Sequence, residues 1–201
     1  MKEKTNVLLL NEKNTSTVVK VVSSSLLKGN ICVIPTDTIY GIVALDSYPE
    51  SVNRIYEIKK RPAVKPFIRL IGSLDNLSSY TEQEVPDPLR KYWPGPLTII
   101  FRDFQHGTVS IRYPDDAFLH SLFRVLDYKV IVAPSANISG EDNIYECSEL
   151  IETFKGKVST IVCLKTGRVK KEVSTIIDIS GPEWKIIREG ALHIELQILQ
   201  E

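Results

Sequence analysis

Short runs of apolar, often β-branched residues alternate irregularly with amphipathic stretches along this 201-residue chain. The runs have the length of buried strands, and we expect strands at 7–10, 31–35, 67–71, 97–101, 109–112, 129–133, 160–164, 175–179 and 184–187. Apolar residues at helical spacing, bounded by capping residues or proline, predict helices at 14–28, 49–61, 117–126 and 147–154. Because the alternation is irregular, we predict an α/β fold with a mixed sheet rather than a regular doubly wound one.

Composition narrows the class of protein. Hydrophobic residues make up 43% of the chain and charged residues 25%, which is the balance of a globular domain with a sizeable core. No repeat, low-complexity segment or linker-like shift interrupts the sequence, so we expect a single domain over 1–201. The 25 basic and 25 acidic residues give zero net charge, which argues against a protein that wraps nucleic acid through one large basic face.

The cysteines and the apolar runs predict a cytoplasmic protein without a membrane segment. Cys32, Cys147 and Cys163 are odd in number and lack CxxC spacing, so neither a disulfide framework nor a zinc knuckle is expected. Cys32 and Cys163 lie in apolar runs and are interpreted as buried small hydrophobic residues. The run 7–10 is too short for a signal-peptide core, and no run approaches the roughly 20 residues that span a bilayer.

Familiar nucleotide and metal motifs are missing. The sequence has no P-loop, no GxGxxG, no GxSxG and no His/Cys cluster, so no metal held by protein ligands is predicted. Polar residues gather instead where predicted strands end, at 36–41, at Arg112 and at 135–140. Ligands of open α/β sheets bind beyond strand ends, which favours a binding site there. For any one cluster taken alone, turn formation by the same residue types is the favoured explanation.

A basic segment at 59–66 joins Lys59, Lys60, Arg61 and Lys65 to two prolines. Arginine forks and lysine point charges suit phosphate oxygens, and the prolines would hold the segment open. The same cations would also complement the dipole of a helix C-terminus. The segment alone therefore does not distinguish an ATP site from a helix C-terminus that carries basic residues.

Taken together, these segments resemble the YrdC-like family of L-threonylcarbamoyladenylate synthases from roughly Asn11 to Leu192. Seven short motifs occur in the family's order, and their number and spacing make the resemblance specific. They are PTDTIYG at 35–41, KKRP at 59–62, WPGPLT at 93–98, SIRYP at 110–114, APSANISG at 133–140, STIID at 174–178 and IREGA at 187–191.

The resemblance implies a twisted mixed sheet whose concave face binds L-threonine, bicarbonate and ATP, with Mg2+ entering on the ATP. It implies a nucleotidyltransferase that makes L-threonylcarbamoyl-AMP and pyrophosphate. A tRNA-modifying threonylcarbamoyl-transferase complex would then use the product to form N6-threonylcarbamoyladenosine in tRNA. The family's phosphate-holding tetrad, which we take as the catalytic set, matches Lys59, Arg61, Ser135 and Asn137. Its threonine-binding positions match Thr36, Arg112, Ala133 and Ser174, and its other nucleotide positions match Thr108 and Arg188.

The chain departs from the family pattern in several places. A Ser-Pro-Thr-like turn is replaced by Glu141–Ile144, the glycine usual before the late Ser-Thr is absent from Lys171–Val173, and Phe67 stands in place of leucine. These changes leave the tetrad intact and would reshape the nucleotide edge of the cleft. The chain ends at Glu201, so we expect no extra C-terminal domain of the kind that longer members carry.

Two other functions compete with the synthase. The first is a non-catalytic paralogue that keeps the cleft but binds RNA or the ribosome, with a weak RNA path formed by residues 59–69 and by Lys165, Arg168, Lys170 and Lys171. A solvated charged face explains the same lysines. The second is a carbamoyl-adenylating enzyme with an acceptor other than threonine, which threonine selectivity would distinguish.

Overall fold

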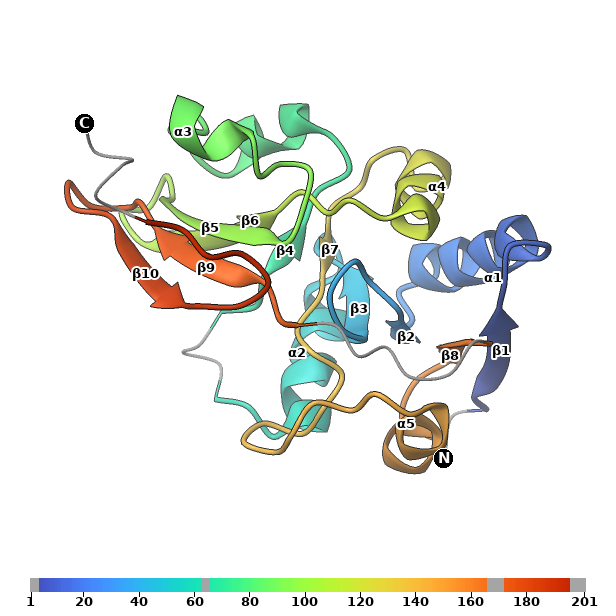
Figure 1. Cartoon of the computed structure of the whole chain (residues 1–201). Coiled ribbons are helices and arrows are strands. Elements are labelled where there is room, and N and C mark those ends of the chain that lie inside the picture. Colours follow the sequence, from blue (N-terminus) through green and yellow to red (C-terminus); the bar gives the residue numbers. More distant parts are fainter. Residues whose placement is uncertain (1–3, 63–65, 166–171, 196–201) are drawn as a thin grey trace.

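A single mixed sheet organises the computed structural model, which describes residues 4–62, 66–165 and 172–195 (Figure 1). Within these residues the sheet has ten strands in the order β1-β8-β2-β3-β7-β4-β6-β5-β9-β10. The strands are β1 (Asn6–Leu10), β2 (Cys32–Ile34), β3 (Gly41–Leu45), β4 (Arg69–Leu70), β5 (Leu97–Arg102), β6 (Thr108–Arg112), β7 (Ile131–Val132), β8 (Thr160–Leu164), β9 (Thr175–Asp178) and β10 (Lys185–Arg188). Figure 1 shows the sheet strongly twisted between its β1 and β10 ends.

Parallel and antiparallel pairs mix along the sheet, as predicted from the irregular alternation. The parallel pairs are β1 with β8, β2 with β8, β4 with β6 and β5 with β9. The antiparallel pairs are β2 with β3, β3 with β7, β4 with β7, β5 with β6 and β9 with β10. Polar strand ends from distant parts of the sequence thereby meet near the middle of the sheet.

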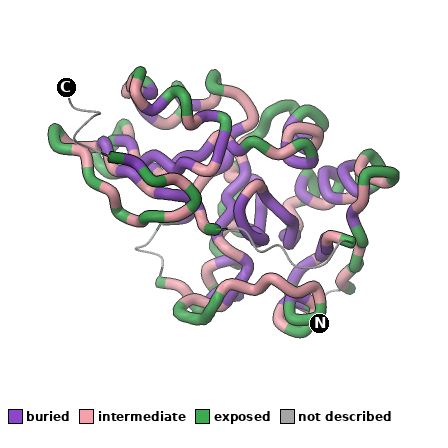
Figure 2. Tube along the Cα trace, in the orientation of Figure 1, coloured by how far each residue is buried: buried purple, intermediate pink, exposed green. Residues whose placement is uncertain are grey.

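Helices cover both faces of the central strands. Helices α1 (Thr15–Leu27) and α4 (Ala117–Val125) pack on one face, and α2 (Pro49–Lys59) and α5 (Cys147–Phe154) pack on the other. In β3 the side chains alternate between these two cores, with Val43 on the α1 side and Ile42 on the α2 side. A third core lies under the 3-10 helix η1 (Leu74–Ser79) and the short α3 (Asp87–Arg90), against β5, β6 and β9. The buried trace in Figure 2 follows these strands.

Most predicted elements are confirmed, and the differences have local causes. Strand β3 was not predicted, because its first residue, Gly41, was assigned to the polar cluster 36–41 and the apolar run left after it is only four residues long. Strands predicted at 67–71 and 129–133 pair over only two residues each. Helix α2 ends at Lys59, since Lys60 caps it in the left-handed conformation with φ 52°. Arg61 therefore lies outside the helical turn that the basic run predicted.

The expected absence of a disulfide is wrong. Cys147, at the start of α5, is bonded to Cys163 in β8, with their Cα atoms 5.5 Å apart. The pairing depends on packing of α5 against β8, which the spacing of 16 residues in sequence does not reveal. Cys163 is therefore a disulfide-bonded cysteine, whereas Cys32 is a buried thiol, as expected. Among the helices of the described residues, none combines the length and apolar character needed to cross a membrane.

Candidate functional site

A cleft of about 460 Å3 opens where the polar strand ends meet. Its walls come from the turn after β2, the end of the basic segment, β6, the segment after β7, and the approaches to β9 and β10. Seven of the ten residues singled out from the sequence line it: Thr36, Arg61, Arg112, Ala133, Ser135, Ser174 and Arg188. The cleft thus brings residues from separate motifs into one space.

Lys59 lies at the side of this cleft and is almost fully buried, at 1% exposure. Its Nζ atom donates to the Ser135 carbonyl at 2.5 Å, to the Asn137 carbonyl at 2.6 Å and to Asn137 Oδ1 at 3.1 Å. Ser135 Oγ donates to the same Oδ1 at 2.6 Å. Burial, with the nearby positive charge of Arg61, lowers the pKa of Lys59 to about 8. Lys59 therefore organises the turn that carries Ser135 and Asn137.

The turn that departs from the family pattern is attached to the same cluster through backbone atoms. Asn137 Nδ2 donates to the Glu141 carbonyl at 2.6 Å, and the Ser139 amide donates to the Lys59 carbonyl at 2.9 Å. Asn143 lines the cleft. Because the Glu141 contact uses a carbonyl oxygen, a changed side chain at this position leaves the geometry of the cluster in place.

Arg112 forms the centre of a second cluster in the cleft. It is 5% exposed, its Nη1 donates to Thr38 Oγ1 at 2.9 Å, and its Nη2 lies 3.3 Å from Asp37 Oδ1. Burial lowers the pKa of Arg112, and the negative charge of Asp37 opposes that shift. Sequence reasoning assigned no role to Asp37 and Thr38. The signal for them was the run of polar residues 36–38, which immediately follows a fully buried strand.

A second guanidinium lies close to the first. Arg188 donates from Nε and Nη2 to the Ser174 carbonyl at 3.0 and 2.8 Å, and from Nη2 to Ser174 Oγ at 3.0 Å. Ser174 Oγ also lies 2.9 Å from Thr98 Oγ1. Burial lowers the pKa of Arg188, and the positive charge of Arg112 lowers it further. Two arginines beside one paired carboxylate give this side of the cleft a positive excess, which suits a carboxylate ligand.

Two predicted residues differ in how they relate to the cleft. Thr36 lines it, and its hydroxyl donates to the Ile39 carbonyl at 2.7 Å and accepts from the Thr38 amide at 3.1 Å, so it shapes the turn. Thr108 is exposed at the far end of β6, opposite Arg102, and lies outside the lining residues. Ser110, two residues nearer to Arg112 on the same face of the strand, lines the cleft instead.

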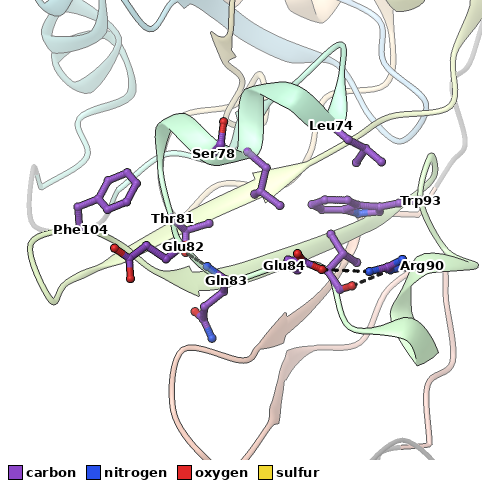
Figure 3. Close-up of a pocket in the computed structure, with 11 residues that line it drawn as sticks. Leu74, Ser78, Thr81, Glu82, Gln83, Glu84, Arg90, Trp93 and Phe104 are labelled. Atoms are coloured by element: carbon purple, nitrogen blue, oxygen red, sulfur yellow. Dashed lines mark hydrogen bonds and ion pairs between the residues drawn. The ribbon is translucent and has the colours of Figure 1, made fainter.

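A larger hollow of about 680 Å3 lies elsewhere and contains none of the predicted site residues (Figure 3). Buried Leu77, Val85 and Trp93 line it together with Leu74 and Phe104, each 53% exposed. Its arginine, Arg90, is already paired with Glu84 at 3.3 Å and with Asp87 at 3.1 Å. The hydrogen bond from Trp93 Nε1 goes to the Leu97 carbonyl. The wall of this cavity is mostly apolar, and the Thr81 and Gln83 side chains in its lining already bond to backbone atoms of Arg102 and Ile179.

Two further expectations concern metals and RNA. Across residues 4–62, 66–165 and 172–195, no group of three or more His, Cys, Asp or Glu side chains is placed to hold a metal ion. Lys165 is exposed after β8. Arg168, Lys170 and Lys171 of the RNA path lie outside the described residues, as does Lys65.

Comparison with known proteins places these features in a family. Residues 24–190 match the Sua5/YciO/YrdC family model, which carries the description "Telomere recombination". The chain is 31% identical to a threonylcarbamoyl-AMP synthase of Pyrococcus abyssi. The matched region covers 95% of this chain and 59% of that relative. The chain is 29% identical to a putative threonylcarbamoyl-AMP synthase of Methanocaldococcus jannaschii, over 92% of each protein.

Solved structures give the same relation. The structure of Sua5 from P. abyssi complexed with L-threonine superposes with a TM-score of 0.78 at 26% identity, covering 94% of this chain and 58% of that one. The structure of YciO from E. coli, at 18% identity, superposes with a TM-score of 0.80 over 98% of this chain and 99% of that one. The second likeness concerns the fold alone.

Proposed function

Because the chain belongs to the Sua5/YciO/YrdC family, we propose that it makes L-threonylcarbamoyl-AMP and pyrophosphate from L-threonine, bicarbonate and ATP. One observation carries the proposal above the rest. A single cleft joins the Arg112–Arg188 side, which suits a carboxylate, to the Arg61–Ser135 side, which suits phosphates. The strands that carry or precede most of these residues belong to one sheet, which supports a single site.

The arginine side would hold L-threonine. Arg112 presents a planar guanidinium that suits the threonine carboxylate, and Asp37 with Thr38 fixes its orientation. Arg188 and Ser174 would add a positive charge and a hydroxyl, with Thr36 and the backbone at Ala133 completing that end of the cleft. The structure of P. abyssi Sua5 complexed with L-threonine supports L-threonine as the ligand.

The opposite side would hold the ATP phosphates. Arg61 and Ser135 line the cleft, and Lys59 adds its positive charge while it fixes the turn of Ser135 and Asn137. Arg188 lines the same cleft and would also add positive charge toward the nucleotide, and Thr108 lies farther out along β6, where an extended nucleotide would have to reach. Mg2+ would arrive on the triphosphate, where it neutralises phosphate charge. The hydroxyl, amide and guanidinium groups of the lining fit such a complex, because they bind phosphate oxygens and leave the ion to the nucleotide.

The chemistry needs three anionic or polar reactants to meet. The threonine amine attacks bicarbonate with loss of water, and the resulting carbamate oxygen attacks the α-phosphorus of ATP, which expels pyrophosphate. Charge accumulates on the phosphate and carbamate oxygens, so positioning and positive charge carry the catalysis. No covalent intermediate with the protein is required. The acyl-adenylate product is reactive in water, and we infer that a tRNA-modifying threonylcarbamoyl transferase takes it up.

The experiment that tests this function measures pyrophosphate release with Mg2+-ATP, L-threonine and bicarbonate, and then omits each co-substrate in turn. We expect release only when all three are present, and loss of release in Lys59→Ala and in Arg61→Ala. The second variant matters because removal of the buried Lys59 side chain leaves two carbonyls without their donor. Release without threonine would indicate another acceptor. No release, together with salt-dependent tRNA binding, would replace the synthase by an RNA-binding protein.

A further inference from the structure

Two stacked aromatic rings, one before and one after the basic segment (59–66), lie against each other. Tyr56, on α2 just before Lys59, and Phe67, just after the segment, have ring centroids 3.9 Å apart and planes inclined by 17°. Phe67 is 3% exposed and contributes to the cleft wall. The two rings therefore hold together the two chain ends between which Arg61 lies.

Arg61 lies over this stack. Its Cζ atom is 5.4 Å from the centroid of the Phe67 ring, which is cation–π distance. Its Nη2 donates to the Pro66 carbonyl at 3.3 Å, and its backbone amide donates to the Tyr56 carbonyl at 3.0 Å. The two guanidinium contacts are with Phe67 and its neighbour Pro66, so this part of the chain limits where the guanidinium can lie.

The electrostatics of Tyr56 agree with this geometry. Burial raises the pKa of its hydroxyl, and the positive charge of Arg61 is the largest opposing influence. The charge of Arg69 and a hydrogen bond with the Phe67 backbone oppose the rise further. The guanidinium thus acts on Tyr56 as well as on Phe67, and all three groups form one unit.

We propose that Phe67, held in place by Tyr56, is the positioning residue that fixes Arg61 at the phosphate side of the cleft. The inference deepens the proposed function and rests on it for the identity of the ligand. A leucine at position 67 would fill similar space but would offer no π face, so the arginine would lose an attraction and regain rotamer freedom. In this chain, Phe67 would therefore hold Arg61 in one orientation before the ligand binds. Position 67 is also one at which the sequence departs from the family pattern.

Enzyme kinetics and a double-mutant cycle test the proposal. For Phe67→Leu we expect the KM for ATP to rise about 2- to 5-fold, which is the effect of about 0.5–1 kcal/mol of cation–π attraction, with kcat and the KM for threonine unchanged. Phe67→Tyr keeps the ring and should restore the wild-type KM. Because Arg61→Ala is expected to abolish turnover, the cycle is measured as the Kd for Mg2+-ATP by calorimetry, and in the Arg61→Ala background Phe67→Leu should leave that Kd unchanged. An equal effect in both backgrounds would overturn the inference, because Phe67 would then not act through Arg61.

A readout without nucleotide separates this inference from the proposed function. The 15Nε order parameter of Arg61, measured by NMR on the free protein, should be high in wild type and in Phe67→Tyr and should fall in Phe67→Leu. The matched control is Phe101→Leu, an equal truncation in the core under η1, which should leave Arg61 unaffected. An unchanged order parameter in Phe67→Leu would overturn the inference whatever the protein catalyses. A fall in a protein that releases no pyrophosphate would overturn the proposed function and leave the inference intact.

Discussion

Two hollows lie on opposite faces of β6, and they differ in almost every chemical respect. Ser110 and Arg112 face the cleft, whereas Val109 and Ile111 belong to the core that also contains Leu77, Val85 and Trp93 of the larger cavity. Alternation along the strand sends successive side chains to the two faces. The larger hollow is apolar and its arginine is already paired, while the smaller one collects cationic and hydroxyl groups from separate motifs. Convergence of polar groups, rather than volume, is why we propose the smaller hollow as the substrate site.

The comparison predicts that the largest loss of activity comes from the polar side. Arg112→Lys keeps a charge but removes the planar fork that suits a carboxylate. We expect threonine-dependent pyrophosphate release to fall about 10²- to 10³-fold, the usual cost of losing a preorganised donor in an active site. Binding of Mg2+-ATP, measured by calorimetry, should change less than about threefold. A loss of ATP binding as large as the loss of activity would show that Arg112 does not belong to a separate threonine side.

Truncation on the apolar side should affect stability and spare activity. Leu77→Ala removes a buried side chain beside the larger cavity, and we expect the free energy of unfolding to fall by about 2–3 kcal/mol. Urea denaturation measures this loss. The KM for threonine should stay within about twofold of wild type. A large rise in that KM in the folded variant would indicate that the two faces of β6 are coupled.

The lowered pKa of Lys59 predicts opposite pH trends for binding and stability. Because its pKa is about 8 in the folded protein, below the ordinary lysine value of 10.5, the unfolded chain binds more protons between those values. The contribution of Lys59 to the free energy of unfolding therefore rises as the pH increases from about 8 to 10.5, and this gain is lost again as the pH falls back to 8. Phosphates prefer the charged amine, so ATP affinity should weaken about tenfold as the pH rises from about 7 to about 9.

Comparison of two neighbouring lysines isolates this effect. Lys59→Met should remove both trends, whereas the matched variant Lys60→Met, at an exposed residue just past the end of α2, should keep them. Calorimetric titration with ATP and denaturation across the pH range supply the two curves. If both variants follow the wild-type curves, another group is responsible for the pH dependence.

The smallest effects should come from the two polar residues spaced along β6. Ser110→Ala should raise the KM for one substrate about fivefold, since Ser110 lines the cleft and one neutral hydrogen bond contributes about 1 kcal/mol. Thr108→Ala should change every kinetic constant less than about twofold, because Thr108 is exposed at the other end of the strand. The reverse ranking would show that the nucleotide reaches farther along β6 than the cleft does.

Much of this arrangement was predictable from sequence because its causes are local. Periodicity and capping predicted α1, α5 and β8 nearly to the residue, and seven of the ten proposed site residues line one cleft. What escaped prediction depends on contacts between distant segments. The burial of Lys59 follows from acceptors near position 135, the role of Asp37 from an arginine on another strand, and the Cys147–Cys163 bond from the packing of α5 on β8.

The central claim, that the polar cleft and not the larger cavity receives the substrates, can be tested by an NMR titration. Addition of L-threonine to 15N-labelled protein should shift the backbone amides around Thr36–Gly41, Arg112, Ser174 and Arg188. Subsequent addition of Mg2+-ATP should shift those around 59–61 and 133–143. Amides of Thr81–Val85 and Phe104, at the apolar cavity, should stay in place. Shifts centred on the cavity, with the cleft unperturbed, would contradict the account.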